Sequence, residues 1–122
     1  MLDRLMDDLS SQDEISWACL VGDDGTPIRM RPGVLSSPEA AAALAEQTMA
    51  KAEAHLNGEE LQRMSLVGEN GIIVLVRINE SHVLISCGRE KRSHGTVRAI
   101  TTEIAKRMSS IIALGINRTK DQ

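Results

Sequence analysis

Apolar residues along the chain follow two spacings, one typical of helices and one typical of strands. Four apolar residues recur at three- and four-residue intervals between Leu2 and Leu9, which predicts a helix over residues 2–9. The run ISWACLV at 15–21 is apolar on both faces of an extended chain. Strands covered on both faces have this composition, so we expect an interior strand here.

Later segments continue both spacings. Pro27 lies early in a second predicted strand, near 26–31, which indicates an edge strand or a strand start. Ser37 and Pro38 are favourable N-cap and first-turn residues for a second helix that Asn57-Gly58 ends. The remaining pattern predicts three strands and an amphipathic helix, at 59–67, 72–78, 82–87 and from Ser93 or Thr96 onward.

The predicted order is helix, two strands, helix, three strands, helix. Short loops join the strands within each group, so both groups are expected to form antiparallel hairpins. The fold class is therefore α+β, a sandwich in which helices pack on one five-stranded antiparallel sheet. The 122 residues suit a single domain, which we expect over 1–114 with a flexible C-terminal tail at 115–122.

The phrases LVGDDG at 20–25 and LVGENG at 66–71 are nearly identical. Neither has the alternating acids and closing carboxylate of a calcium loop, and neither precedes a helix N-terminus that would hold phosphate. Asp-Gly and Asn-Gly supply positive φ angles in tight hairpins. Both phrases are therefore interpreted as hairpin turns, and no metal site is expected.

Composition narrows the range of functions. The chain has one Trp, no Tyr and no Phe, which argues against the aromatic platforms that bind single-stranded nucleic acid. The formal net charge of −3 speaks against a dedicated DNA-binding module. No signal peptide or membrane-length apolar run is present, so a cytoplasmic location is expected. Cys19 and Cys87 lie in apolar strands and are interpreted as buried thiols, with a disulfide left open.

Candidate chemistry is sparse. The three histidines and two cysteines have no metal-ligand spacing, and Ser86-Cys87-Gly88 lacks the motif of a catalytic nucleophile. We therefore expect no enzyme and no cofactor. Bases near the start of the last helix could bind a phosphate or an acidic partner, or could be solvated; they are Arg89, Lys91, Arg92, His94 and Arg98.

The second helix is the most informative element for function. A small-residue stripe at heptad-like spacing runs along it, and a row of acids lies beside the stripe. The stripe comprises Ala42, Ala45, Met49, Ala52 and Leu56, and the acidic row comprises Glu39, Glu46 and Glu53. The stripe could pack on the chain's own sheet, but apolar residues cover more than one face, which favours self-association. The third strand, which lacks proline, could add an edge-to-edge pairing.

Together, the element order, LVG-x-x-G after the first strand, GIIVLV at 71–76 and SHGTVRAITTEIAKRM at 93–108 resemble the Roadblock / dynein light chain family, which includes bacterial gliding-polarity regulators. The resemblance covers about residues 1–113. It implies a profilin-like sandwich that dimerises by pairing third strands and second helices into one continuous sheet. It also implies a non-enzymatic platform for small Ras-like GTPases.

Carried onto this sequence, the resemblance assigns two sets of residues. The dimer interface would contain Ala41, Leu44, Ala45, Thr48, Met49, Ala52, Leu61, Arg63 and Ser65. The acids Glu39, Glu46 and Glu53 would be available to a protein partner. We therefore expect a homodimeric adaptor that binds and regulates a small GTPase without inserting into a membrane. A ligand-sensing module of similar shape is the alternative, although the shortage of aromatics disfavours a ligand pocket.

Overall fold

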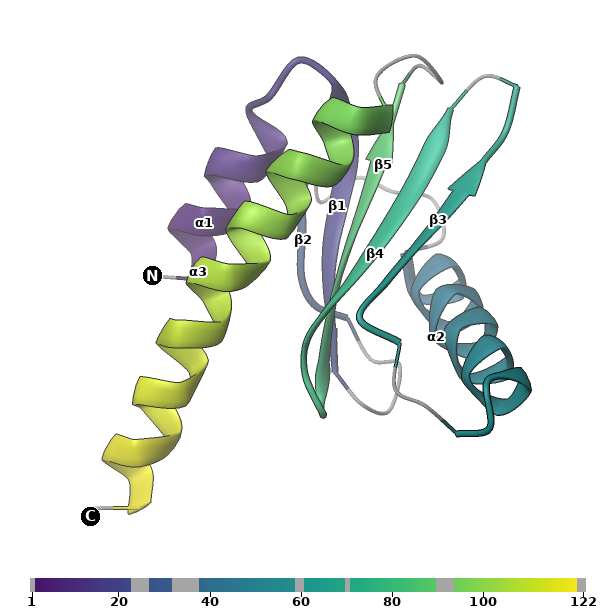
Figure 1. Cartoon of the computed structure of the whole chain (residues 1–122). Coiled ribbons are helices and arrows are strands. Elements are labelled where there is room, and N and C mark those ends of the chain that lie inside the picture. Colours follow the sequence, from purple (N-terminus) through teal and green to yellow (C-terminus); the bar gives the residue numbers. More distant parts are fainter. Residues whose placement is uncertain are drawn as a thin grey trace.

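The computed structural model describes residues 2–22, 27–31, 38–58, 61–69, 71–89 and 94–120, with only the backbone described for 38–46 and 114–120. The expected order of helices and strands is confirmed (Figure 1). The elements are α1 (Leu2–Ser10), β1 (Ile15–Gly22), β2 (Pro27–Arg31), α2 (Pro38–His55), β3 (Arg63–Val67), β4 (Ile72–Asn79), β5 (His82–Gly88) and α3 (His94–Lys120).

Two elements differ in length from the sequence prediction. β3 begins at Arg63 rather than at residue 59, since Leu61 and Gln62 lead into the strand without belonging to it. The helical backbone of α3 continues to Lys120, into the segment 115–122 for which the sequence predicts a flexible tail. Flexibility of that segment stays a prediction. The predicted N-cap Ser37 and the turn residues 23–26 and Asn70 lie outside the described residues.

All five strands form one antiparallel sheet with the order β2-β1-β5-β4-β3. β1 pairs with both β2 and β5, as its apolar residues on both faces predict. β2 forms one outer edge, in agreement with the early position of Pro27. β3 forms the other outer edge. The pairing of β1 with β5 joins the two hairpins into a single sheet.

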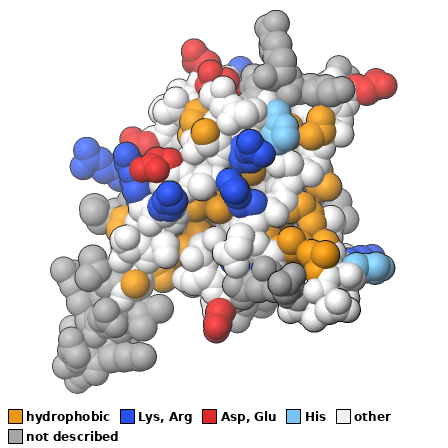
Figure 2. Space-filling view, in the orientation of Figure 1, with side chains coloured by type: hydrophobic (Ala, Val, Ile, Leu, Met, Phe, Trp, Pro, Cys, Tyr) orange, Lys and Arg blue, Asp and Glu red, His pale blue; other side chains and the backbone are white. Residues whose placement is uncertain are grey.

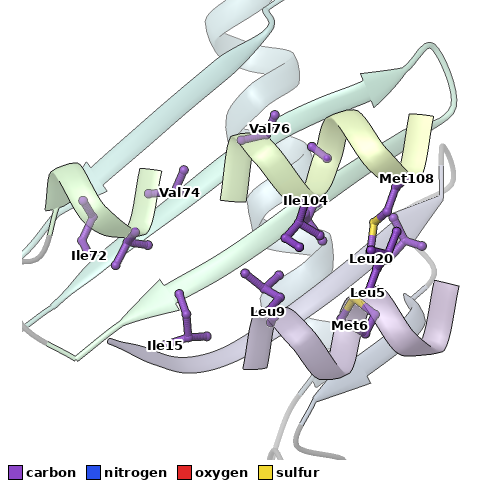
Figure 3. Close-up of a cluster of buried hydrophobic side chains, with 14 residues drawn as sticks. Leu5, Met6, Leu9, Ile15, Leu20, Ile72, Val74, Val76, Ile104 and Met108 are labelled. Carbon is purple, nitrogen blue, oxygen red and sulfur yellow. The ribbon is translucent and has the colours of Figure 1, made fainter. Parts of the chain in front are cut away.

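One face of the sheet carries the larger core, beneath α1 and α3 (Figures 1 and 3). Met6, Leu9 and Met108 are fully buried there against the strand residues Leu20 and Leu84. Aliphatic and methionine side chains make up this core, as the scarcity of aromatics requires. The two buried polar side chains described in it are satisfied, because Thr101 Oγ1 donates to the Val97 carbonyl at 2.6 Å and lies 2.9 Å from Ser86 Oγ.

The opposite face carries α2 and a smaller core (Figure 1). Met49 of α2 is 2% exposed and packs with Cys19, Val21, Leu75 and Ile85. α2 ends as predicted: Asn57 and Gly58 both have positive φ, of 60° and 79°, and the Gly58 N–H donates to the Glu53 carbonyl at 3.0 Å. No described helix contains a stretch long and apolar enough to cross a membrane.

The acidic N-terminal segment pairs with the edge strand β2. Asp3 accepts from Arg29 Nε at 2.8 Å and from Arg31 Nη2 at 3.2 Å, while Asp7 accepts from Arg31 Nε at 2.8 Å. The positive charge of Arg29 lowers the pKa of the Asp3 carboxyl. These exposed pairs hold α1 beside β2, so the two arginines act within the fold and are not presented as free guanidinium groups.

Gly88 of β5 lies directly beneath Val97 of α3 in tight packing. A methyl group added there would lie 2.8 Å from Cγ2 of both Ile72 and Val97. We expect Gly88→Ala to lower the free energy of unfolding by about 1–3 kcal/mol, because the close-packed core cannot accommodate the added volume. Urea denaturation followed by circular dichroism measures this. Gly95→Ala is the control, since nothing lies within 4 Å of its added carbon; equal losses from both variants would contradict the packing account.

Burial raises the pKa of the Cys19 thiol to about 11, from a usual value of 9.0. A pKa that is higher in the folded state means that the folded chain keeps the proton while the unfolded chain ionises. Stability from this group is therefore complete below pH 9 and is lost as the pH rises from about 9 to 11. We expect thermal unfolding midpoints of the wild type to fall more steeply over this window than those of Cys19→Ala. Parallel pH profiles would contradict this.

Candidate interaction surface

The outer edge of β3 is the first component of the candidate surface. The Arg77 N–H donates to the Gln62 carbonyl at 2.8 Å, and the Gly68 N–H donates to the Gly71 carbonyl at 2.9 Å. Hydrogen-bonded and non-hydrogen-bonded pairs alternate along an antiparallel ladder. The intervening Arg63, Ser65 and Val67 therefore direct their N–H and C=O groups away from β4. No strand in the described part of the chain pairs with this edge.

Exposed apolar side chains lie beside this edge. Leu66 and Val67 of β3 are 41% and 49% exposed, and Leu56, just beyond α2, is 45% exposed. Figure 2 shows apolar side chains gathered between β3 and α2. Leu66 and Val67 also line a shallow hollow of about 530 Å³ with Ile73 and Cys87. An open strand edge beside apolar surface has the properties of an association site.

α2 divides its residues between the chain's own core and the outside. Met49 is buried against its own sheet, and Thr48 and Ala52 are half-buried. The small-residue stripe therefore packs on the chain's own sheet at least at Met49. Of the two interpretations of the stripe, own-sheet packing and self-association, this supports the first at that residue. The side chains of Ala41, Leu44 and Ala45 lie outside the described residues, so a helix–helix contact through them stays a prediction.

The three predicted interface residues around β3 have different surroundings. Leu61 packs against the smaller core, and its N–H donates to Glu53 Oε1 at 3.3 Å. Arg63 is exposed at the start of β3. Ser65 Oγ lies 3.2 Å from His94 Nε2, which ties the strand to the start of α3. The structure thus brings Arg63 and Ser65 together on the open edge and places Leu61 beneath α2.

Glu53, the one described member of the acidic row, is engaged inside its own chain. It forms an ion pair with Arg77 of β4, and the two side chains are only 23% and 13% exposed. Arg77 Nε also donates to the Leu61 carbonyl at 2.8 Å. This network joins α2, β4 and the segment before β3. Sequence reasoning missed Arg77, although a lone arginine in the apolar run IIVLVRI was its signal. The side chains of Glu39 and Glu46 lie outside the described residues.

Reactive groups are not assembled on the described part of the chain. Both cysteines are free thiols, and burial raises the pKa of each, which opposes formation of a thiolate. Ser86 is buried, and its Oγ lies 2.9 Å from Thr101 Oγ1. His82 Nδ1 lies 2.9 Å from Asn79 Oδ1 in the β4–β5 turn. The one hydroxyl that lies beside an imidazole among the described residues is that of Ser65, 3.2 Å from His94 Nε2, and no described carboxylate contacts that imidazole.

A hollow of about 190 Å³ lies between α2 and the β4–β5 hairpin. Met49, Glu53, Arg77 and His82 contribute to its lining. Sites for small molecules usually have about 300–1,000 Å³, so this hollow is small for a ligand. Two of its charged groups, Glu53 and Arg77, already pair with each other, and Glu80 also lines it. It gives the ligand-sensing alternative little support.

Comparison with known proteins yields similarity in structure alone. No protein-family model matches the sequence, and no curated protein matches it. MglB from Myxococcus xanthus is 16% identical with a TM-score of 0.81, covering 92% of this chain and 94% of that chain. A Roadblock/LC7 domain from Streptomyces avermitilis is 17% identical with a TM-score of 0.77, covering 91% and 97%.

The fold is also shared with a more distant group. Profilin II from Acanthamoeba castellanii is 21% identical with a TM-score of 0.61, covering 80% of this chain and 86% of that chain. The expectation of a profilin-like sandwich with the order α-β-β-α-β-β-β-α is confirmed. The chain has the fold of the Roadblock/LC7 domains and of MglB.

Proposed function

We propose that this chain is a member of the Roadblock / dynein light chain family and acts as a non-enzymatic homodimeric adaptor. Its partner is a small Ras-like GTPase, which it binds and regulates in the cytoplasm. The observation that carries the proposal is the open β3 edge beside exposed Leu66 and Val67. The fold and the motifs that resemble the family support the same function.

In the proposed dimer, two β3 strands pair antiparallel through the outward backbone groups of Arg63, Ser65 and Val67. The two sheets then continue as one, and the apolar side chains beside each edge leave water. The second helices approach one another on the same side of the joined sheet. Ala41, Ala45 and Ala52 are the small residues that would permit this approach, and Leu44 would lie in the same contact.

The GTPase contact is proposed for the α2 side of the dimer. Glu39 and Glu46 are its acidic candidates. Glu53 is the weaker candidate, because its carboxylate already binds Arg77 and the Leu61 N–H. The role of Glu53 is then to hold α2 in place for the residues that touch the partner.

Ser65→Pro tests the strand pairing, because proline removes an outward N–H without removing a bond to β4. The wild type should have about twice the 13.3 kDa chain mass by light scattering. Each dimer of the variant loses two backbone hydrogen bonds of about 1 kcal/mol each, so dimerisation should weaken by about thirtyfold or more.

Ser65→Ala is the matched control, since it removes only the hydroxyl group that contacts His94. It should remain dimeric. Ala45→Arg and Ala52→Arg test the helix contact in the same assay, with circular dichroism to verify folding. A monomeric wild type at micromolar concentration would reject the proposed dimer, and a dimeric Ser65→Pro would reject its geometry.

The GTPase function is tested by affinity capture in the presence of a non-hydrolysable GTP analogue or GDP. We expect a Ras-like GTPase to be retained with one nucleotide and not with the other, because its switch segments change conformation with the γ-phosphate. The purified GTPase then gives a dissociation constant and a single-turnover hydrolysis rate with and without the chain. Equal retention in both nucleotide states, or no GTPase, would count against this function.

A further inference from the structure

Another hollow, separate from the two described above, lies on the sheet face opposite α2, where α3 runs beside β3 and β4. Its volume is about 230 Å³. Val76, Ile78 and Ala105 contribute apolar surface to it, while Thr102 of α3 adds a polar group. Arg63 of β3 and Lys106 of α3 line opposite sides. The hollow therefore combines an apolar part with polar groups, to which Gln62 and Ser109 also contribute, and exposed cationic side chains flank it.

These cations are exposed and lack carboxylate partners among the described residues. No ion pair within the described ranges includes Arg63, Lys106 or Arg98, and all three side chains are exposed. Arg98 stands two helical turns before Lys106, with Thr102 midway between them, so it extends the same side of α3. Figure 2 shows lysine and arginine side chains gathered where α3 meets the strands.

Four other described basic residues are paired locally, whereas Arg4, Lys51 and Arg89 are exposed and also lack an ion pair within the described ranges. Arg29 and Arg31 pair with acids of α1, Arg77 pairs with Glu53, and Arg107 pairs with Glu103 on the α1 side of α3. The chain as a whole carries a net charge of −3. What distinguishes Arg63, Arg98 and Lys106 is that they lie along one hollow, which makes that hollow locally positive on a chain that is acidic overall.

We propose that this hollow, lined by Arg63 and Lys106 and extended by Arg98, binds an acidic peptide segment of a protein partner. Carboxylates of the peptide pair with the basic side chains, and an apolar side chain between them covers Val76, Ile78 and Ala105. The acidic net charge of the chain disfavours nucleic acid or an anionic membrane as the occupant.

The helix sets the spacing of the carboxylates. Arg98 and Lys106 are eight residues apart, so their Cα atoms are separated by about 12 Å along α3. An extended peptide spans this distance in about four residues. The preferred segment therefore carries two acids about four residues apart, with an aliphatic residue between them.

This surface adds a function to the proposed adaptor without depending on it. α3 and α2 lie on opposite faces of the sheet, so a partner on α2 would leave the α3 hollow accessible (Figure 1). The chain could then hold two proteins at once, one on each face.

The test uses fluorescence anisotropy with a labelled synthetic peptide in which two glutamates, about four residues apart, flank a leucine. We expect saturable binding at low salt that weakens as the Debye length shortens with added salt. Lys106→Gln and the double variant Arg63→Gln/Lys106→Gln should raise the dissociation constant by about threefold and tenfold. Arg107→Gln is the matched control, because it removes a charge from the other side of the same helix.

Several outcomes would overturn the proposal. They are no peptide binding by the wild type at low salt, equal binding by a peptide with glutamine in place of glutamate, and an equal loss on Arg107→Gln. Sedimentation with anionic phosphatidylserine vesicles that depends on Lys106, without peptide binding, would assign the hollow to a membrane instead. Light scattering of each variant separates these results from failure of the proposed dimer, because Lys106 is not among the residues proposed for the dimer interface, whereas Arg63 is.

Discussion

Burial of one sheet face beneath α1 and α3 is the interaction on which the rest of the structure depends. The larger core draws residues from α1, α3, β1, β4 and β5, so it joins both ends of the chain to the middle of the sheet. Apolar burial contributes about 25 cal/mol per Å² removed from water, which makes this the main stabilising term. Gly88 lets α3 approach the sheet closely enough for that packing to be complete.

The other face is less complete within a single chain. α2 covers part of it through Met49, but Leu66 stays exposed there, and the adjoining β3 edge keeps an open row of backbone donors and acceptors, with Val67 exposed on the opposite face. One sheet face is covered within the chain, and the other is only partly covered. This arrangement suits a protein that works through association, because exposed surface remains for a second molecule after folding. The proposed dimer uses the β3 edge, and the proposed GTPase contact uses the α2 side.

Charged residues also fall into two groups, those that pair within the chain and those that stay exposed without a described partner. Glu53 and Arg77 form a largely buried pair that also binds both backbone groups of Leu61, so it fixes α2 and the start of β3 relative to β4. Asp3 and Asp7 fix α1 beside β2. Arg63 and Lys106 have no such internal role among the described residues, and their positions on either side of one hollow are what distinguish them.

The sequence by itself determined the order of the elements, the hairpins, the interior position of β1 and the end of α2 at Asn57-Gly58. These features follow from local rules of periodicity and turn geometry, which act over a few neighbouring residues. Only the tertiary structure decided that Met49 faces the chain's own core, that Glu53 binds Arg77, and that Arg63 and Lys106 share a hollow. Each of these depends on contacts between residues far apart in the chain, and periodicity along one helix or strand does not specify which distant side chain lies opposite.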